Sequence, residues 1–438
     1  MVSLDKINEK RARVSVIGLG YVGLPLSVSV AEAGINTVGI DKNQGLVERL
    51  GKKGGTANGI SATKLDRLKK EDKLAFSSDY SALESSDITV ISVPTPLNQY
   101  REPDMSHIRE SLKGISPYLE RGNLVIVEST LYPRATEDEV GPLIEEETDL
   151  TPGEDFYLVF SPERIDPGNK DYSLTDVPKV VGPTSKKGGR LAEEFYRTVL
   201  DSEVHTVSSP RVAEMEKLLE NIYRNVNIAL VNELDTICEE MDIDIWETIE
   251  AASTKPYGFQ PFYPGPGVGG HCIPVDPFFV NWKAKEENSG ARFIELAGQI
   301  NRNRPRYVVS KLMDLLNERE KSLKGSKVLL LGMAYKKDIG DTRNSPGLKI
   351  AEILIEKGSE VKYNDPYVEE VDIGQEEVSL VSVDLDLNLL KTVDSVVIVT
   401  DHSDYDYDWL VENSGLVLDT RNATAGLDGA KGNKVVKI

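Results

Sequence analysis

The sequence predicts an α/β protein in which two doubly wound domains flank a helical middle region. Three observations predict this fold class. Short apolar strands alternate with amphipathic helical segments in the N-terminal half, a long run with helical spacing begins at Pro210, and the strand–helix alternation returns at Lys327. Because such alternation favours a parallel sheet covered on both faces, we expect three domains, at residues 1–208, 209–315 and 316–438.

The predicted strands are short and rich in β-branched residues, and several run into Gly, Pro or Ser. In the N-terminal domain we expect strands at 13–18, 37–41, 88–93, 124–128, 157–160 and 179–182, with helices at 24–33 and 104–119. In the C-terminal domain we expect strands at 327–332, 360–365, 394–400 and 416–419, with a helix at 346–357. Both sets have the strand–helix–strand order of a doubly wound sheet.

The middle region begins with one long helix. Ser209 can cap it, and Pro210 suits its first turn. Apolar residues then recur at helical spacing for about 32 residues, or about 48 Å at the usual rise per residue. One small domain needs no helix of that length, so we expect it to join two domains or to build a subunit interface. Further helices are expected at 246–252 and 291–317.

The composition is that of a globular protein with an excess of acidic residues. Lys and Arg number 51 against 72 Asp and Glu, a net charge of −21, which would repel a polyanion such as nucleic acid. No apolar run approaches the ~20 residues of a membrane-spanning helix, and the N-terminus lacks the apolar segment of a secretion signal. The two cysteines and four histidines form no metal-ligand pattern. We therefore expect a cytoplasmic protein that binds no nucleic acid, membrane or metal.

A glycine-rich motif, GLGYVG, follows the first strand and precedes a helix. Its residues are Gly18, Gly20, Tyr21, Val22 and Gly23. Glycines at this spacing allow a tight turn, close approach of a pyrophosphate and close helix–strand packing. The next strand ends at Asp41, whose carboxylate can accept hydrogen bonds from a ribose and would repel a 2′-phosphate, so the pattern indicates NAD rather than NADP. The alternative is a glycine-rich turn without a ligand.

A second motif, GPGVGGHCIPVDP, spans residues 265–277. Its glycines and prolines predict an irregular backbone that can wrap an anion or a sugar. Cys272 lies near the end of this loop, four residues before Asp276, and is a candidate nucleophile. The alternative for Cys272 is a small buried hydrophobe. Cys238, which shares a helical face with Leu234 and Met241, is predicted to lie in the core.

Two further groups of polar residues complete the candidate site. Lys217 and Asn221 share one face of the long helix, and Asn225 extends that face. Residues Lys336–Lys337 and Asp341–Arg343 lie in the loop after the first strand of the C-terminal domain. Open α/β sheets bind ligands beyond the carboxyl ends of their strands, so these cations could hold a phosphate. In both cases a solvated surface is the alternative.

A series of motifs resembles, in order, those of the UDP-glucose/GDP-mannose dehydrogenase family, the nucleotide-sugar 6-dehydrogenases. The motifs are GLGYVGLPL, SVPTPL, VESTLYP, FSPERIDPG, EKLLENIYRNVNIALVNE, GPGVGGHCIPVDP and GMAYKKDIGDTRNSP. The resemblance runs from about Val14 to Asp365, and the stretch TKPYGFQPFYPGPGVGGHCIPVDPFF is most similar to UDP-N-acetylglucosamine 6-dehydrogenases. It implies two Rossmann-like domains joined by the long helix, which also forms a homodimer.

The resemblance implies a four-electron oxidation of the 6-hydroxyl of a UDP-sugar to a carboxylate, with two NAD molecules reduced. Cys272 matches the family's nucleophile, which forms a thiohemiacetal and then a thioester. Lys217 matches the lysine that stabilises developing oxyanions, and Asn221 matches a hydrogen-bond donor beside them. Asp276 matches the carboxylate that supports proton transfer and water activation.

The resemblance also implies binding residues. Glu163 and Thr130 match positions around the hydrolytic water. The cofactor residues added to the glycine motif and Asp41 are Thr95, Thr130 and Arg343. The residues implied for the UDP-sugar are Glu163, Arg164, Lys217, Asn221, Phe262, Tyr263, Gly267 and Lys336, with the backbone of 262–267 along the nucleotide. Some family members send an arginine into the neighbouring subunit's sugar site, but here the nearby positions are Lys255, Pro256 and Tyr257.

Other functions stay open at this point. A two-electron dehydrogenase of β-hydroxy acids shares the first domain and the long helix, but it needs no cysteine loop and no second Rossmann-like domain. A non-catalytic NAD-binding regulator would not need the set of Lys217, Asn221, Cys272 and Asp276. Within the family, UDP-N-acetylmannosamine and UDP-glucose are alternative substrates, because the three sugars differ only at carbon 2 and few contacts decide between them.

Overall fold

The computed structural model describes residues 1–57, 59–164, 172, 176–200, 202–374, 378–427 and 434–438. The chain divides into two compact units. The first contains Met1–Glu220 and Phe278–Ser289, and the second contains Asn221–Pro277 and Gly290–Ile438. The long helix α8 (Pro210–Glu240) therefore contributes its first turns to one unit and the rest to the other.

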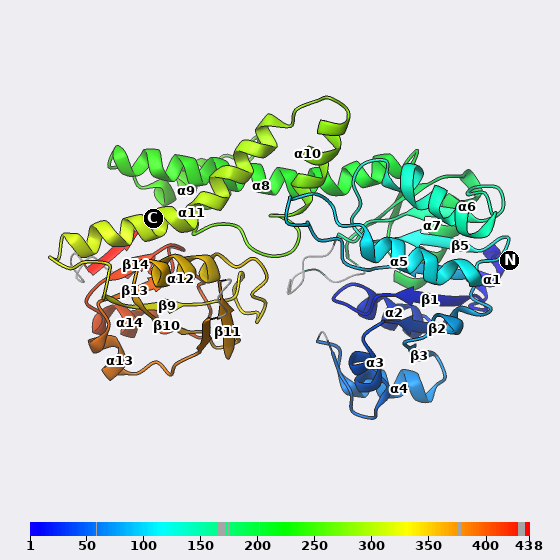
Figure 1. Cartoon of the computed structure of the whole chain (residues 1–438), viewed down its shortest axis with the longest axis horizontal. Coiled ribbons are helices and arrows are strands. Elements are labelled where there is room, and N and C mark those ends of the chain that lie inside the picture. The colour runs from blue at the N-terminus through cyan, green and yellow to red at the C-terminus, as the bar shows by residue number, and fades with distance from the viewer. Residues whose placement is uncertain (58, 165–171, 173–175, 201, 375–377, 428–433) are drawn as a thin grey trace. The chain divides into compact units, whose positions relative to one another are not determined.

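The first unit is built on an eight-stranded sheet with the order β3-β2-β1-β4-β5-β6-β7-β8 (Figure 1). Its strands are β1 (Arg13–Ile17), β2 (Asn36–Ile40), β3 (Leu74–Ser77), β4 (Ile88–Ile91), β5 (Leu124–Val127), β6 (Tyr157–Phe160), β7 (Lys179–Pro183) and β8 (Val204–Thr206). The six predicted strands are confirmed. The sequence did not predict β3 and β8, which are only four and three residues long. The sheet is parallel except that β7 runs antiparallel to β6, which corrects the expectation of a fully parallel sheet.

Helices pack on this sheet through its apolar side chains. They are α1 (Leu4–Asn8), α2 (Gly23–Glu32), α3 (Gln44–Gly51), α4 (Ala62–Lys70), α5 (Ser106–Ile115), α6 (Gly141–Thr148) and α7 (Lys186–Leu200). All four residues of β4, β5 and β6 are buried. One core cluster joins Val16 and Val90 of the sheet to Phe195 of α7, and another joins Leu24 of α2 to Leu65 of α4. The central strands are thus completely buried, and their ends can position a site.

Helix α8 confirms the predicted long helix, at 31 residues. Its apolar residues are not all buried: Ala213, Leu218 and Ala229 lie in the core, whereas another set is exposed. The exposed set is Val212, Met215, Leu219, Tyr223, Leu230, Leu234 and Ile237. The prediction that Cys238 lies in a core with Leu234 and Met241 is wrong, since both neighbours are exposed and Cys238 itself is half-buried against a small cluster with Val231.

The second unit contains a five-stranded parallel sheet with the order β10-β9-β13-β14-β15. Its strands are β9 (Lys327–Leu331), β10 (Glu360–Asn364), β13 (Ser395–Ile398), β14 (Val417–Asp419) and β15 (Val435–Lys437). A separate antiparallel pair, β11 (Glu370–Ile373) and β12 (Val378–Val381), was not predicted, and neither was β15. The helices are α9 (Ile245–Ser253), α11 (Arg292–Asn317), α12 (Pro346–Glu356), α13 (Leu387–Thr392) and α14 (Tyr407–Asn413), and α10 (Asp276–Glu286) begins here and continues into the first unit.

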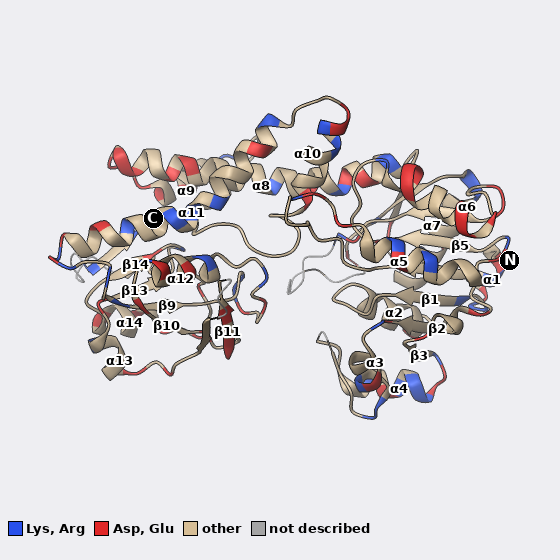
Figure 2. Ribbon diagram, in the orientation of Figure 1, with Lys and Arg blue, Asp and Glu red and all other residues tan. Residues whose placement is uncertain are grey.

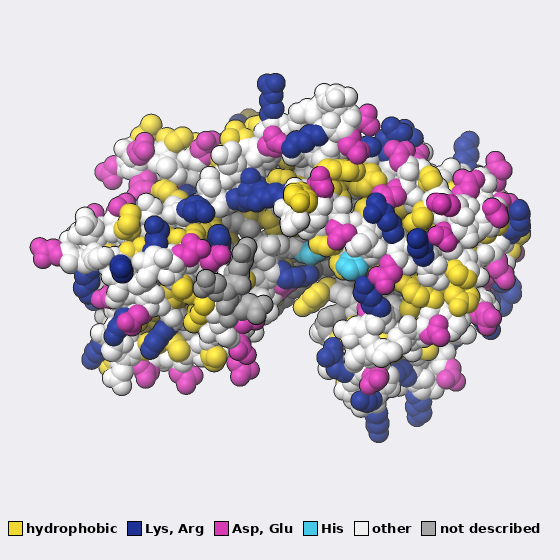
Figure 3. Space-filling view, viewed as in Figure 1, with side chains coloured by type: hydrophobic (Ala, Val, Ile, Leu, Met, Phe, Trp, Pro, Cys, Tyr) yellow, Lys and Arg dark blue, Asp and Glu magenta, His cyan; other side chains and the backbone are white. Residues whose placement is uncertain are grey.

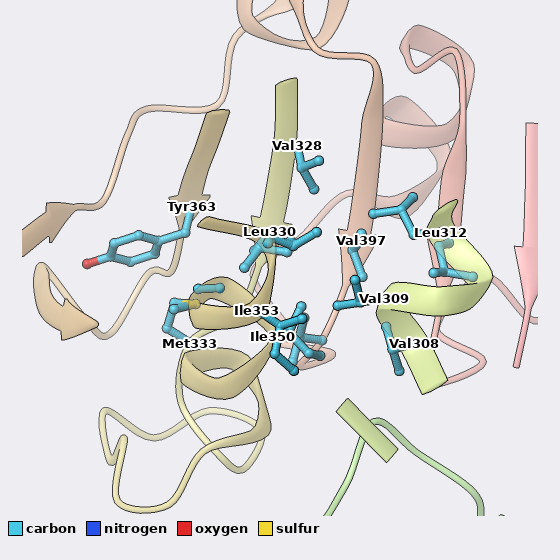
Figure 4. Packing of buried hydrophobic residues seen from close by; sticks show 14 of the residues in the cluster. Val308, Val309, Leu312, Val328, Leu330, Met333, Ile350, Ile353, Tyr363 and Val397 are labelled. Carbon is cyan, nitrogen blue, oxygen red and sulfur yellow. The ribbon is translucent and has the colours of Figure 1, made fainter. Parts of the chain in front are cut away.

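Helix α11 packs on this second sheet and belongs to its core. Figure 4 shows Val309 and Leu312 of α11 facing Leu330 of β9 and Val397 of β13, with Ile350 of α12 beside them. All five side chains are at most 1% exposed. The predicted helix at 291–317 is therefore confirmed, and its buried side chains belong to the core of the second unit.

Charge and apolarity are distributed as the composition suggests. Figure 2 shows acidic and basic residues interspersed over most elements of both units. Among the described residues, no helix is long and apolar enough to cross a membrane. The same residues contain no group of three or more His, Cys, Asp or Glu side chains arranged to hold a metal ion.

Candidate active site

The glycine motif forms the turn between β1 and α2. Gly18 has a φ of +91°, and a Cβ there would lie 2.3 Å from the Ser92 carbonyl oxygen of β4's end. A Cβ on Gly23 would lie 1.9 Å from the Gly18 carbonyl oxygen, so this position brings the helix onto the turn. Gly20 is exposed and has open space around it. The turn therefore offers accessible backbone at the start of a helix, which is the arrangement that binds a pyrophosphate.

Asp41 follows β2 and lies beside that turn. Its Oδ2 accepts a hydrogen bond from the Leu19 amide at 2.8 Å, and its Oδ1 accepts one from the Asn43 amide at 2.9 Å. The half-buried carboxylate is thus fixed in orientation by two backbone donors. Its place at the end of the second strand fits a partner for the ribose of NAD.

The carboxyl ends of β4 and β5 bring Thr95 and Thr130 together. The Thr95 hydroxyl donates to the Thr130 carbonyl oxygen at 2.8 Å. Ser129 reinforces the link, because its hydroxyl accepts from the Val93 amide at 2.8 Å and donates to the Val93 carbonyl at 2.7 Å. Two residues that the sequence implied for the cofactor are therefore neighbours at the edge of the sheet where ligands bind.

Glu163 and Arg164 follow β6, and the structure ties Arg164 to α8. Its guanidinium donates to Glu220 at 3.0 Å and to the Pro178 carbonyl at 2.8 Å, and it lies 3.2 Å from Glu216. Burial alone would lower the pKa of Arg164, but the carboxylates of Glu220 and Glu216 outweigh it and raise that pKa. Arg164 was implied as a substrate ligand, and here it holds a loop to a helix. The remaining residues of this motif, 165–168, lie outside the described residues.

On α8, Lys217 and Asn221 are one turn apart, and both side chains are buried. In the second unit, the side-chain amide of Asn221 donates to Asp276 Oδ2 at 2.5 Å. Arg224 donates to the Asn221 side-chain carbonyl. Asp276, which is 2% exposed and begins α10, is thus held by a residue of α8.

Cys272 lies one turn before Asp276. Its carbonyl oxygen accepts from the Val275 amide at 3.1 Å and from the Asp276 amide at 2.8 Å, so the cysteine leads directly into α10. The side chain is half-buried, and neither cysteine forms a disulfide. The structure therefore brings Cys272, Asp276 and Asn221 together: a thiol, a buried carboxylate and the amide that orients it.

The loop before Cys272 packs against the loop after β9. The Gly270 amide donates to the Arg343 carbonyl at 2.8 Å, and the Asn344 side chain donates to the Gly270 carbonyl at 3.0 Å. A Cβ on Gly269 would lie 2.5 Å from Tyr335 Cβ, so this approach requires glycine. The loop that carries Cys272 and the loop that carries Lys336 and Arg343 therefore form one structure.

Three predicted ligand residues have partners of their own in the second unit. Tyr263 stacks on Trp246 with ring centroids 5.5 Å apart, and Phe262 packs edge-to-face on Tyr223 with ring centroids 5.7 Å apart. The guanidinium of Arg343 pairs with Asp341, with Nη2 and Oδ2 2.6 Å apart. Gly267 has a φ of +139° and lies where a Cβ would contact α11 and α12.

A buried polar group at Gly265 was not predicted from the sequence. Asn232 of α8 accepts from the Gly265 amide at 3.0 Å, and Arg304 of α11 donates to the Gly265 carbonyl at 2.9 Å. The half-buried guanidinium of Arg421 lies close enough that a Cβ on Gly265 would be 3.1 Å from its Nη1. No local pattern signals these residues, because a polar side chain in an amphipathic helix looks like a solvated one.

The predicted residues divide between the two units. The glycine motif, Asp41, Thr95, Thr130, Glu163, Arg164 and Lys217 lie in the first unit, and Asn221, Phe262, Tyr263, Gly267, Cys272, Asp276, Lys336 and Arg343 lie in the second. Each unit presents its own part of the chemistry: a dinucleotide-type turn in the first, and a thiol with a buried carboxylate in the second.

Comparison with known proteins identifies the family. The NAD binding domain of the UDP-glucose/GDP-mannose dehydrogenase family matches residues 12–200, its central domain matches 211–303, and its UDP binding domain matches 329–426. This chain belongs to the UDP-glucose/GDP-mannose dehydrogenase family. It is an NAD-dependent enzyme of the UDP-sugar dehydrogenase class, and NAD is its cofactor.

Relatives share most of their length with this chain. A UDP-N-acetyl-D-glucosamine 6-dehydrogenase of Pseudomonas aeruginosa is 36% identical over 84% of this chain and 86% of its own. A UDP-N-acetyl-D-mannosamine dehydrogenase of Pyrococcus horikoshii is 34% identical over 90% of each chain. A solved structure of the UDP-D-ManNAc dehydrogenase from Pyrococcus horikoshii has a TM-score of 0.88 at 31% identity and covers 97% of this chain and 99% of its own.

Proposed function

We propose that this enzyme oxidises the 6-hydroxyl of UDP-N-acetylglucosamine to the carboxylate in two successive two-electron steps. The observation that carries the proposal is the arrangement of Cys272 with Asp276 and Asn221. An ordinary alcohol dehydrogenation needs no thiol, whereas oxidation of an aldehyde to an acid needs a nucleophile that holds the aldehyde carbon. A half-buried thiol one turn before a buried, amide-oriented carboxylate supplies that nucleophile.

Each step assigns work to residues of this chain. Bound NAD accepts the electrons that leave carbon 6 in each oxidation. Cys272 adds its sulfur to the aldehyde carbon, which gives a thiohemiacetal, and oxidation converts this to a thioester. Lys217 stabilises the oxyanion that develops at carbon 6, and Asp276, held by Asn221, supports proton transfer at the same carbon.

Hydrolysis of the thioester completes the cycle. Water attacks the carbonyl carbon, the carbon–sulfur bond breaks, and the cysteine sulfur recovers a proton. Glu163 accepts the proton of the water, and Thr130 lies with it around that water. The UDP-sugar is bound by Phe262, Tyr263, Gly267 and Lys336, with Arg164 holding the Glu163 loop to α8.

The sugar is tested by measuring NADH formation with a panel of UDP-sugars. We expect the highest kcat/KM with UDP-N-acetylglucosamine and two NADH formed per sugar. The stretch before Cys272 and the name of the Pseudomonas relative support this choice. UDP-N-acetylmannosamine is the second candidate, because several relatives are named for it. A higher kcat/KM with that sugar would reject the first choice, and one NADH per sugar would reject the four-electron reaction.

We also propose that the enzyme is a homodimer formed through α8. The exposed apolar set on that helix includes Leu230, half exposed, and Leu219, 58% exposed. Figure 3 shows apolar side chains at the surface over α8 and α9. Several large apolar side chains exposed along one helix favour a partner. Replacing Leu230 with Glu should convert the dimer to a monomer in light scattering, and an unchanged mass would place the interface elsewhere.

A further inference from the structure

A buried cluster of charged side chains contacts Glu163 in the first unit. Lys179, the first residue of β7, has a side chain that is only 4% exposed. Its Nζ lies 2.8 Å from Glu128 Oε1 and 3.1 Å from Glu163 Oε2. The Tyr196 hydroxyl of α7 donates to the same Glu128 oxygen at 2.7 Å, and its ring lies 5.1 Å from the lysine nitrogen. The lysine therefore bridges a buried carboxylate and a carboxylate of the proposed site.

The charges in this cluster depend on one another. Burial alone would lower the pKa of Lys179, but Glu128 and Glu163 outweigh it and raise that pKa, so the ammonium stays charged. Glu128 has no exposed side-chain surface, and burial raises its pKa against the opposing effect of Lys179. A buried carboxylate in this position anchors the ammonium, and the ammonium in turn faces Glu163.

Glu163 is fixed from two sides. Its Oε2 binds Lys179, and its Oε1 accepts from the Arg164 amide at 2.7 Å. Arg164 is itself bound to Glu216 and Glu220 of α8, one residue before and three residues after Lys217. Among the described residues, the charged and titratable groups around Glu163 include Lys179 of β7, Glu128 at the end of β5, Tyr196 of α7, Arg164, and Glu216 and Glu220 of α8.

We propose that Lys179 is a positioning residue for thioester hydrolysis: it holds the Glu163 carboxylate ionised and oriented to take the proton of the attacking water. The proposal rests on the role of Glu163 given above. In that step the water oxygen bonds to the thioester carbon, its proton passes to Glu163, and the carbon–sulfur bond breaks. Only an ionised carboxylate can accept this proton, and without Lys179 the carboxylates of Glu128 and Glu163 would face each other with no cation between them, which favours a shared proton.

The test separates hydrolysis from oxidation. With Lys179→Met, NADH formation in the first turnover should continue, while release of the acid slows and a covalent sugar adduct accumulates in intact-protein mass spectra. The acid limb of the pH profile for hydrolysis should move up by about one pH unit or more, the usual effect of a neighbouring charge. Below the limb, that shift slows hydrolysis about tenfold. Lys179→Arg should return the acid limb to its pH in the unmodified enzyme, because arginine restores the positive charge.

A second variant should shift the acid limb of the pH profile for hydrolysis in the opposite direction, to lower pH. Glu128→Gln keeps the shape of the buried side chain and leaves Lys179 with Glu163 alone, so the acid limb should move to lower pH. This variant keeps the proposal testable if Lys179→Met fails to fold. Glu163→Gln should slow hydrolysis in every case.

Three outcomes separate the role of Glu163 from the role of Lys179. If Glu163→Gln hydrolyses the thioester at the normal rate, the proposed role of Glu163 is wrong. If Glu163→Gln slows hydrolysis but the acid limb of the pH profile stays in place in both Lys179→Met and Glu128→Gln, Lys179 has only a structural role in the sheet. Opposite shifts in the two variants, with rescue by arginine, would establish Lys179 as the positioning residue.

Discussion

Arg304 offers the most quantitative test of how the cysteine loop is held. Its guanidinium is 3% exposed and donates to the Gly265 carbonyl at 2.9 Å, the Asn232 carbonyl at 3.2 Å and Asp235 Oδ2 at 2.7 Å. Replacing Arg304 with Met keeps most of the side-chain length and removes all of these donors. The change leaves the Gly265 carbonyl without this donor and leaves Asp235, 4% exposed, without its cation.

The expected loss of stability follows from those two groups. Breaking a buried ion pair by removing one partner costs about 3–5 kcal/mol, since the other charge stays buried. An unsatisfied buried carbonyl costs about 1–3 kcal/mol. The two losses together would cost about 4–8 kcal/mol, and we expect the lower end, about 4 kcal/mol, because effects that share one side chain are not additive. Asp235→Asn added to Arg304→Met removes the stranded charge and should recover about 2 kcal/mol.

The loss of unfolding free energy in Arg304→Met should also depend on pH. Burial raises the pKa of Asp235 even with Arg304 in place, and removing the arginine should raise it further. A carboxyl group whose pKa is higher in the folded state binds more protons there, so the unfolding free energy falls as pH rises from the unfolded value, about 4, through the folded value. The deficit of Arg304→Met should therefore be smallest in acid and complete at neutral pH.

The assay is urea unfolding at fixed protein concentration, at pH 4.5 and 7.5, with the KM for the UDP-sugar measured on the same samples. The KM should rise because Gly265 begins the loop that leads to Cys272. Arg306→Met is the matched control, since Arg306 is exposed on the same helix and should change stability by less than about 0.5 kcal/mol. A loss below about 1 kcal/mol for Arg304→Met, or no recovery in the double variant, would refute this account of the loop.

Two further predictions address the chemistry. Cys272→Ala should still bind the UDP-sugar and NAD but should lose steady-state turnover, which in the unmodified enzyme forms two NADH per sugar. Cys272→Ser should turn over very slowly, with a covalent sugar adduct visible by mass spectrometry. Near-normal NADH formation by the alanine variant would remove Cys272 from the mechanism. Asp41→Ala should raise the KM for NAD and narrow the enzyme's preference for NAD over NADP, because we assign this carboxylate to the ribose. Equal use of both cofactors by the unmodified enzyme would contradict that role.

The fold was predictable where the signal is local. Val14–Ile17 and Leu124–Val127 are buried along their whole length, so their apolar runs mark strands without any knowledge of neighbours. Strand β3 is a four-residue strand with only Leu74 fully buried, and nothing in such a segment distinguishes it from a loop. The direction of β7 depends on which strand it pairs with, which the pattern of one segment does not encode. The domain boundaries at 208 and 315 stay predictions.

The candidate site was likewise predictable where its residues are close in the sequence. Cys272 and Asp276 are four residues apart, so one helical turn is enough to bring them together. The contact from Asn221 to Asp276 spans 55 residues, and that from Lys179 to Glu163 joins the first residue of β7 to the segment after β6, 16 residues away. The family motifs named both Asn221 and Asp276, whereas they named Glu163 and missed its partner Lys179. These partners act through burial and charge, which become visible only when the chain is folded.

The two doubly wound sheets use the same aspartate position differently, and this difference can be tested. Asp365 ends the second strand of the second unit, as Asp41 does in the first. Its Oδ2 accepts from the amides of Met333 and Ala334 at 2.6 and 2.9 Å and lies 3.2 Å from His402 Nε2. Both amides belong to fully buried residues and are bound by Asp365, so these two amides, unlike the exposed backbone at Gly20, are closed to a pyrophosphate.

Asp365 therefore serves the loop rather than a dinucleotide. That loop continues to Lys336, which we assign to the UDP-sugar, and to Arg343, which we assign to the cofactor. Asp365→Asn replaces one acceptor oxygen by a donor and should loosen the first residues of the loop, the part nearest Lys336. We expect it to raise the KM for the UDP-sugar by a larger factor than the KM for NAD, and Asp41→Ala to do the reverse. If Asp365→Asn weakened NAD more than the sugar, the second turn would hold dinucleotide after all, and the assignment of the two turns would have to be exchanged.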